Sequence, residues 1–344
     1  MDAAPMATSL LYKKTLGCLL GGIIGDAMGT PSEGKDYQDI EREFGWIEDF
    51  SSDGTDDTVM KDLLTEALVR TSGYATLDDW AAVWLDHWNA IFGSKVAKFY
   101  ISVLHTAHKL RRYALPRLAA LGNMPSSSSA MCISPVGIAN ACNPRLAALQ
   151  AYSLASLIHV HDVGFCQDGA AAMAAGVAEA MRRDASVLSI LTAAQAAIIP
   201  ASGQEMRQRI THALDLARSL ANYTAFRRDV YAGSASFFCT IGCDARETVP
   251  LALALFALAN GDVAKTVTYG ANFGRDADTI ASMAGALAGA LGGADSIPPL
   301  WVQRIRTFAS TDQDDLAEKL VRVAIAKNAQ ETAAARLFQN ICVA

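Results

Sequence analysis

Residues with small side chains recur every four positions in two stretches of this chain. The two sets are Gly17, Gly21, Gly25 and Gly29, and Ala281, Gly285, Gly289 and Gly293. In an α-helix this spacing brings all members of a set onto one face, which lets a second backbone approach closely. The first stretch is too short to span a bilayer and contains Asp26. Close packing of helices in a soluble core is therefore the simpler interpretation.

Apolar residues recur at helical spacing over most of the chain, and alternating β-branched runs are nearly absent. The pattern predicts an all-α protein with helices over Leu10–Ala27, Thr58–Arg70, Leu77–Trp88, Lys95–Leu121, Pro144–Leu157, Asp168–Arg182, Val187–Ile198, Gly203–Asn222, Glu247–Asn260, Thr279–Leu291, Leu300–Phe308 and Gln313–Ala326. Gly, Pro, Ser and Asp predict loops over Thr30–Gly54, Asn123–Ser134, His159–Cys166 and Gly233–Arg246. No solenoid repeat occurs, so a single helical domain over residues 1–344 is expected.

The composition argues against several classes of protein. Hydrophobic residues make up 51% of the chain and charged residues 19%, which is enough apolar material for a large core. A net charge of −6 argues against a general nucleic-acid binder. The seven cysteines are scattered and form no CxxC pair, which favours a reduced cytoplasmic protein over a disulfide scaffold or a zinc ribbon. Neither a signal peptide nor a membrane-spanning segment is predicted.

Two similar acidic motifs stand at expected helix starts, one in each half of the chain. The first reads Gly-Thr-Asp-Asp-Thr over residues 54–58, and the second reads Gly-Arg-Asp-Ala-Asp-Thr over residues 274–279. Helix capping explains Asp and Thr at either position taken alone, but two matching motifs are harder to attribute to capping. Asp26 lies at the end of the first small-residue set and Glu33 follows it, and Asp276 and Asp278 precede the second set. We hypothesise that packing of the two helices brings these acidic segments into one site.

Clustered carboxylates repel one another unless they are protonated or neutralised by a cation. The two motifs offer carboxylate and hydroxyl oxygens only, and such hard ligands suit Mg²⁺ or Mn²⁺ rather than zinc or copper. Their four aspartates are sufficient for two divalent ions, which could hold a diol or a phosphate and activate water. The spacing does not match an EF-hand, whose ligands lie within a single short loop.

At these motifs the chain resembles the ADP-ribosylglycohydrolase family. Residues Gly25 to Glu33 resemble the opening motif of the family, which ends in a functional glutamate. Residues 54–58 and 274–279 resemble its first and second metal motifs, and Ser129 to Gly137 resembles its substrate loop. His159 stands where the family often has a histidine. The resemblance extends from about Thr15 to Trp301, and the order of the motifs makes it specific.

The resemblance implies an orthogonal all-α fold with a binuclear magnesium or manganese centre. Its implied metal ligands are Thr55, Asp56, Asp57, Asp276, Asp278 and Thr279, and its implied substrate-binding residues are Ser129, Ala130, Met131, Cys132, His159 and Arg275. The metals would hold the 2′ and 3′ hydroxyls of a ribose, and cleavage would pass through an oxocarbenium-like sugar. Glu33 would coordinate a metal or move a proton. Either Glu33 or Asp56 could act as the general base toward water.

The chain departs from the family pattern in two places. Cys132 replaces the usual arginine of the substrate loop, and Arg275 and Ala277 replace a glycine and a threonine of the second metal motif. We expect a hydrolase of ADP-ribosylated proteins or ADP-ribose derivatives, with a nucleoside or another small ribosylated molecule as the alternative substrate. A non-catalytic binding protein and a metal-dependent phosphoesterase are the competing functions. The complete acidic set argues against a non-catalytic binding protein, and analysis of the reaction products would identify a phosphoesterase. The sequence leaves the oligomeric state open.

Overall fold

The computed structural model describes residues 8–342, and every regular element within that range is a helix. The first part of the chain forms α2 (Leu10–Gly29), η1 (Thr30–Ser32), α3 (Tyr37–Phe44), α4 (Asp56–Arg70), α5 (Leu77–Asp86), α6 (Trp88–Phe92), η2 (Val96–Lys98), α7 (Ile101–Arg111) and α8 (Pro116–Ala119). The middle forms α9 (Ser134–Ala139), α10 (Pro144–Ala155), η3 (His161–Val163), α11 (Phe165–Ala180), α12 (Val187–Ala196), α13 (Gln204–Leu220), α14 (Tyr223–Ala232) and α15 (Ser234–Phe237). The last part forms α16 (Ala245–Leu258), α17 (Val263–Ala271), α18 (Ala277–Gly292), η4 (Ala294–Ser296), α19 (Pro299–Phe308) and α20 (Gln313–Cys342). The expected all-α fold is confirmed.

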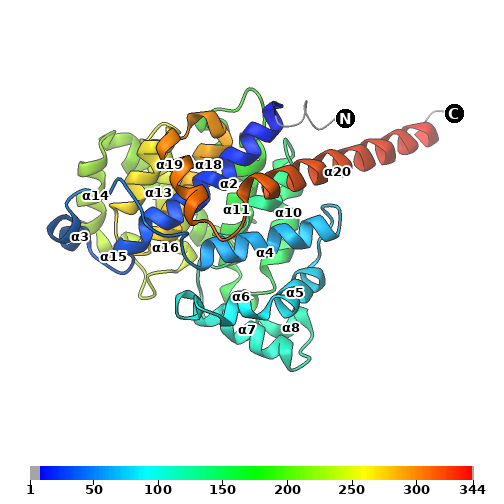
Figure 1. The fold of residues 1–344 in the computed structure, drawn as a ribbon, viewed down its shortest axis with the longest axis horizontal. Coiled ribbons are helices and arrows are strands. Elements are labelled where there is room, and N and C mark those ends of the chain that lie inside the picture. The colour runs from blue at the N-terminus through cyan, green and yellow to red at the C-terminus, as the bar shows by residue number, and fades with distance from the viewer. Residues whose placement is uncertain (1–7, 343–344) are drawn as a thin grey trace.

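Helices α2 and α18 lie side by side in the middle of the molecule and meet along the two small-residue sets (Figure 1). A Cβ added to Gly21 would lie 2.2 Å from the carbonyl oxygen of Gly285, and one added to Gly25 would lie 2.2 Å from that of Ala281. At the end of α2, a Cβ on Gly29 would lie 2.4 Å from the Cα of Asp278. The expected close packing is therefore confirmed, and it brings the end of α2 against the start of α18.

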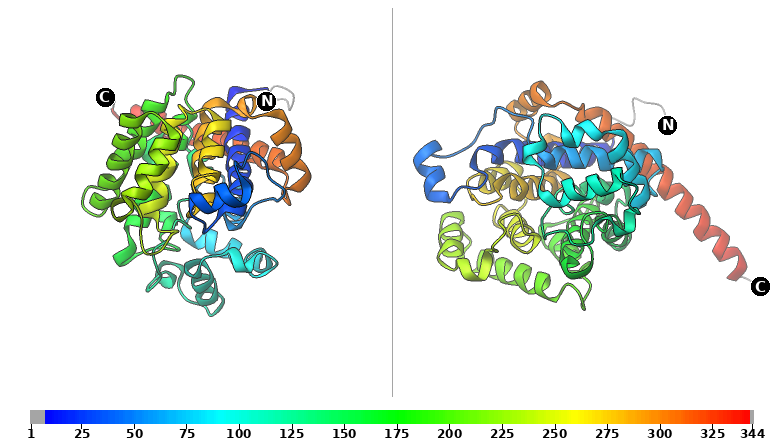
Figure 2. Two further views of the ribbon diagram at one scale, coloured as in Figure 1. Left: turned by 90° about the vertical axis from the view of Figure 1, so that its left-hand side faces the viewer. Right: turned by 90° about the horizontal axis from the view of Figure 1, so that it is seen from below.

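The other helices surround this central pair. Most buried hydrophobic side chains belong to one continuous cluster, with contributions from α2, α4, α11, α16, α18 and the first half of α20. Helices α5 to α8 form a group on one side of the molecule, and α10 to α14 cover another side (Figure 2). None of the described helices combines the length and hydropathy that a bilayer span requires. The central pair is thus enclosed by other helices, of which α11 is itself buried along nearly its whole length.

The structure differs from the sequence prediction in several regions, and in one of them local backbone signals interrupt the apolar pattern. The expected helix Lys95–Leu121 is broken into η2, α7 and α8. Phe99 is extended, Tyr113 has a left-handed φ of 64°, and Leu115 is extended before Pro116, the first residue of α8. The residue before a proline avoids helical geometry, so the break at Leu115 was readable from the sequence. The expected loops over Thr30–Gly54 and Gly233–Arg246 contain the short helices α3 and α15.

Helix α20 extends well beyond the expected end at Ala326. Its first half packs on the body through side chains that include Leu316, Leu320 and Val321. Residues 332–342 are all exposed, and the helix projects away from the body at its C-terminal end (Figure 1). Leu337 and Phe338 keep 69% and 65% of their surface exposed. The fold therefore depends on the first half of α20 and makes little use of its end.

Candidate active site

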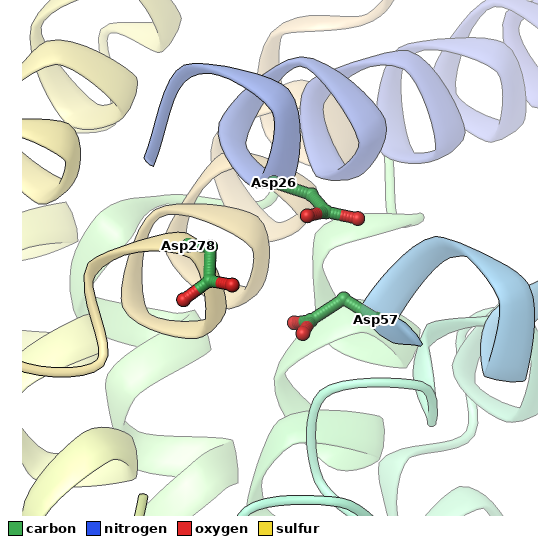
Figure 3. A group of neighbouring side chains, drawn as sticks. All are labelled: Asp26, Asp57 and Asp278. Carbon is green, nitrogen blue, oxygen red and sulfur yellow. The ribbon is translucent and has the colours of Figure 1, made fainter. Parts of the chain in front are cut away.

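Three carboxylates from three different helices converge on one space (Figure 3). Asp26 comes from the last turn of α2, Asp57 from the first turn of α4, and Asp278 from the first turn of α18. One oxygen of each lies within 4.8 Å of the other two, and all three side chains are buried. The hypothesis that the central helix pair gathers the acidic segments is confirmed by this arrangement.

Asp26 holds the start of α4 in place from a neighbouring helix. Thr55, the N-cap residue of α4, makes no side-chain capping bond of its own. Instead, Asp26 Oδ1 accepts the backbone N–H of Thr55 at 2.8 Å and its hydroxyl at 2.9 Å. Asp26 Oδ2 accepts the backbone N–H of Thr58 at 3.1 Å and its hydroxyl at 2.5 Å. Two of these four donors are backbone N–H groups at the start of α4 and two are hydroxyls, so Asp26 takes the place of a side-chain cap for this helix.

Gly54 makes this arrangement possible. It has a left-handed φ of 84°, and a Cβ at this position would lie 2.3 Å from Asp26 Oδ2. A side chain there would both strain the backbone and displace the carboxylate. The glycine of the first acidic motif is thus explained by its contact with α2.

Asp57 and Asp278 carry oxygens that have no partner within the described chain. Asp57 Oδ2 accepts the hydroxyl of Thr279 at 3.1 Å, and the hydroxyl of Thr55 lies 3.5 Å from the same oxygen. Asp57 Oδ1 and Asp278 Oδ1 are buried without a hydrogen bond. A buried, unpaired carboxylate oxygen is costly, and a cation is the ordinary way to satisfy it. The oxygen-only donor set with two unpartnered atoms fits a hard divalent ion.

Electrostatics at the acidic cluster favour either protons or cations. Burial raises the pKa of Asp57, and the charges of Asp26 and Asp278 raise it further. Burial also raises the pKa of Asp278, with Asp276 adding to the effect, and that of Asp56, with Asp26 adding to the effect. The pKa of Asp276 rises to about 7 through burial and the charge of Glu33. Because these carboxyl groups resist losing their protons without a compensating charge, the binding of metal ions here would be accompanied by release of protons.

Glu33 stands at the edge of the acidic cluster. It follows η1, and its side chain is 34% exposed, whereas Asp57 and Asp278 are buried. Lys98, at the end of η2, donates a hydrogen bond to Glu33 Oε2 at 2.6 Å. Hydrogen bonds from Arg275 N to Lys35 O at 2.8 Å and from Gly34 N to Arg275 O at 2.7 Å tie this segment to the second acidic motif. Glu33 is thus held beside the cluster but remains reachable from solvent.

The serine-rich loop before α9 approaches the cluster from another side. Ser127 donates its hydroxyl to Asp276 Oδ2 at 3.2 Å. His159, which contacts the same loop, is fully buried, with Nε2 2.9 Å from Ser126 Oγ and Nδ1 2.9 Å from Ser129 Oγ. Burial lowers the pKa of His159 to about 3, so the ring is neutral and bridges the two serines. In this structure His159 holds the serine-rich loop through Ser126 and Ser129 and is not open to solvent.

The remaining residues expected at the substrate loop are buried as well. Ala130 and Met131 are nearly inaccessible, and Cys132 is fully buried, where its thiol donates to the carbonyl oxygen of Ser128 at 3.3 Å. Burial raises the pKa of the Cys132 thiol far above its usual range. Cys132 is therefore unsuited to act as a nucleophile. The part of this loop that contacts the acidic cluster is Ser127.

Arg275 turns its guanidinium away from the acidic cluster. It makes a two-pronged ion pair with Glu247, with Nε 2.8 Å from Oε1 and Nη2 3.0 Å from Oε2. Nη2 also donates to the carbonyl oxygen of Cys239 at 3.1 Å. All of these contacts are intramolecular. A role for Arg275 in direct substrate binding stays a prediction, and the structure shows the guanidinium engaged elsewhere.

Two contributors to the site were not among the residues predicted for it: Lys98 and Ser127. Asp26 was expected in the site as part of an acidic segment, but its role as the cap of α4 was not predicted. The sequence did carry a signal for Asp26, since an acidic residue inside an otherwise apolar small-residue helix needs buried partners. Lys98 and Ser127 carried no comparable signal, because their positions depend on how η2 and the serine-rich loop fold back on the site.

Comparisons with known proteins agree with this geometry. The family model for ADP-ribosylglycohydrolases matches residues 7–330. The protein YegU of Escherichia coli K12 is 28% identical over 314 residues, which cover 83% of this chain and 90% of that protein. Human ADP-ribosylhydrolase ARH3 is 24% identical over 347 residues, which cover 89% of this chain and 92% of that protein.

A solved structure described as an ADP-ribosylglycohydrolase-related protein complex shares the fold. It superposes with a TM-score of 0.66 at 20% identity, over 91% of this chain and 99% of that one. The match of the family model over almost the whole sequence agrees with the convergence of the three acidic segments. The chain belongs to the ADP-ribosylglycohydrolase family of glycosidase-type hydrolases.

Proposed function

We propose that this protein is a metal-dependent hydrolase that cleaves the glycosidic bond between a ribose and an attached group, in ADP-ribosylated proteins or ADP-ribose derivatives. The observation that carries the proposal is the pair of buried carboxylates Asp57 and Asp278, which lie beside Asp26 and each have one oxygen without a partner. The similarity to human ADP-ribosylhydrolase ARH3 supports the choice of substrate class.

We infer that two Mg²⁺ or Mn²⁺ ions are held by Thr55, Asp56, Asp57, Asp276, Asp278 and Thr279. Asp26 is excluded from this set because each of its oxygens already accepts two hydrogen bonds. When bound, such ions supply positive charge that orients hydroxyl groups and lowers the pKa of water. The position of both acidic motifs at helix N-termini supports a buried ionic site, since the helix dipole favours carboxylates there.

The protein groups around this cluster have distinct tasks in the proposed reaction. Glu33 lies at the accessible edge, where it can take a proton from water, and Asp56 is the alternative base inside the cluster. The carboxylates of the cluster stabilise positive charge that develops on the ribose as the bond breaks. Ser127 fixes the orientation of Asp276 through its hydroxyl.

A smaller substrate, such as a nucleoside or another ribosylated metabolite, is the second candidate. The observation that favours it is the engagement of Arg275 by Glu247, together with the loss of the usual loop arginine at Cys132. Neither position offers a free guanidinium to a phosphate. A reducing, cytoplasmic setting is part of the proposal, and the seven free thiols support it.

Turnover assays with three substrate types would test the proposal. Protein loaded with Mn²⁺ or Mg²⁺ is incubated with an ADP-ribosylated protein, an ADP-ribose derivative or a nucleoside, and free ADP-ribose, ribose and phosphate are separated by chromatography. Asp278→Asn should reduce turnover to below about 1% of the wild-type rate. Asp295→Asn is the control, because Asp295 is an exposed residue paired only with Lys13.

Two results would count against the proposal. Release of inorganic phosphate without a free sugar would identify a phosphoesterase. No product from any substrate in protein that demonstrably binds Mn²⁺ would favour a binding protein without catalysis.

A further inference from the structure

Arg275 stands in a backbone conformation that does not suit an arginine. Its φ is 62°, in the left-handed region where a side chain adds strain. Glycine is the residue that adopts this region without strain. A non-glycine residue persists in such a conformation when its surroundings compensate the strain. The compensation here comes from the contacts of the guanidinium.

These contacts hold one segment of the chain, residues 238–243, which we call the wall segment. The guanidinium lies over the ring of Phe238, 4.5 Å from its centre, and donates to the carbonyl oxygen of Cys239 at 3.1 Å. Its main partner, Glu247, is fully buried and accepts the backbone N–H of Cys239 at 2.7 Å. Both backbone polar groups of Cys239 thus bond to the same ion pair. The ion pair fixes the start of the wall segment.

The other end of the wall segment borders the acidic cluster. The carbonyl oxygen of Cys243 accepts the backbone N–H of Ser127 at 2.6 Å, and Ser127 in turn donates to Asp276. Cys243 lies close enough to Asp276 and Asp56 for their charges to act on its thiol. The wall segment therefore lies between the Arg275 ion pair and the site.

We propose that Arg275 is a positioning residue that holds the wall segment against the ribosyl site and thereby limits the size of the group that the site accepts beside the ribose. The limit on the attached group rests on the proposed function, whereas the claim that Arg275 holds the wall segment does not. The backbone of residue 275 separately anchors the Glu33 segment through Gly34 and Lys35. A glycine at position 275 would keep those backbone bonds and remove the guanidinium alone.

The test compares Arg275→Gly with Arg275→Lys and Glu247→Gln. In Arg275→Gly the amides of the wall segment should exchange with deuterium faster, while Mn²⁺ binding is kept. The KM for the best ribosyl substrate should rise roughly tenfold, more than kcat falls, as expected for the loss of a charge-assisted hydrogen bond. Discrimination between small and bulky attached groups should fall at the same time. In Arg275→Lys, both the deuterium exchange of the wall segment and the KM should lie between the values of Arg275→Gly and those of the wild-type protein.

Glu247→Gln should resemble Arg275→Gly, and the double variant should be no worse than the more affected single one, because both act through the same ion pair. Unchanged exchange of the wall segment, or faster exchange with an unchanged KM and unchanged discrimination, would overturn the inference. Absence of ribosyl turnover in the wild-type protein is a different result. It would remove the proposed function, and the exchange measurements would still decide whether Arg275 positions the wall segment.

Discussion

Thr279 donates its hydroxyl to Asp57 Oδ2 at 3.1 Å, although the two residues are 222 positions apart in the sequence. Each stands in the first turn of a helix, Asp57 in α4 and Thr279 in α18. The bond links the two acidic motifs directly, and Asp26 of α2 adjoins both. The geometry of the site therefore depends on the packing of three helices and responds to changes made far from the acids themselves.

The contact between α2 and α18 gives the first prediction. Gly21→Ala places a Cβ 2.2 Å from the carbonyl oxygen of Gly285, which forces the helices apart and should destabilise the protein by roughly 3 kcal/mol. The affinity for Mn²⁺ should fall as well, because Asp26 belongs to α2 and Asp278 to α18, and separating these helices moves the two carboxylates apart. Urea denaturation and calorimetric titration with Mn²⁺ measure the two effects.

The neighbouring glycine provides the matched control for this change. A Cβ on Gly22 would meet no atom closer than 3.7 Å, so Gly22→Ala should be neutral or slightly stabilising, since alanine favours helix by about 1 kcal/mol over glycine. Equal losses in the two variants, or full Mn²⁺ affinity in a destabilised Gly21→Ala protein, would contradict the coupling between helix packing and the site.

The capping role of Asp26 gives the second prediction. Each carboxylate oxygen accepts one backbone N–H, from Thr55 and from Thr58. In Asp26→Asn the amide NH₂ must face one of these donors in either orientation, which should destabilise the protein by about 2 kcal/mol. Hydrogen exchange should show opening of the first turn of α4. An unchanged unfolding midpoint would mean that α4 does not need this cap.

The raised pKa values of the buried acids give a third prediction, about pH. Burial, followed by the charge of Glu33, raises the pKa of Asp276 to about 7, whereas an unfolded aspartate titrates near about 3.9. The folded state therefore holds more protons than the unfolded state between these values, and stability falls as pH rises through that range. Without metal, the urea midpoint should be lower at about pH 8 than at about pH 5.5.

Divalent metal should oppose this trend, because its binding displaces the same protons. In saturating Mn²⁺ the difference between the two pH values should shrink or reverse. A metal-free protein that becomes more stable as pH rises across this window would show that the acids are not kept protonated by the fold.

The exposed end of α20 gives the fourth prediction. Residues 332–342 make no buried contact, so ending the chain after Gln330 should change the free energy of unfolding by less than about 1 kcal/mol. Leu320→Ala on the same helix should cost about 2–5 kcal/mol, because Leu320 is fully buried. A large loss on truncation would reveal a structural role for the end of the helix.

Much of the fold was predictable because its helices carry clear signals. The apolar spacing located α2, α4, α10 and α13 within a few residues, and the small-residue sets identified the two helices that meet most closely. Helices α9 and α14 were not among the predicted helices, and neither was α17. Its sequence, Val-Ala-Lys-Thr-Val-Thr-Tyr-Gly-Ala, is rich in β-branched residues, and contacts with α18 override that weak local preference.

The sequence predicted those parts of the site that follow from the type of side chain, and it did not predict those that depend on how side chains are oriented in the fold. Paired aspartates at helix starts indicated the acidic cluster, and the structure brings both motifs together. The sequence could not show that the guanidinium of Arg275, in the turn before α18, faces Glu247, because Glu247 lies 28 positions earlier and on α16. It also could not show that His159 is enclosed, since a histidine in a loop is exposed more often than buried.

The central helix pair also determines when the protein can complete its core during synthesis. Helix α2 is buried from Lys14 to Gly29. The glycines of α18 that pack against the glycines of α2 are nevertheless translated late in the synthesis of the domain. As the chain leaves the ribosome, α2 has no partner until all the segments between α2 and α18 have been synthesised. Until then its apolar surface is open to chaperones and to aggregation, and no ribosome-bound fragment that ends before α18 can assemble the acidic cluster.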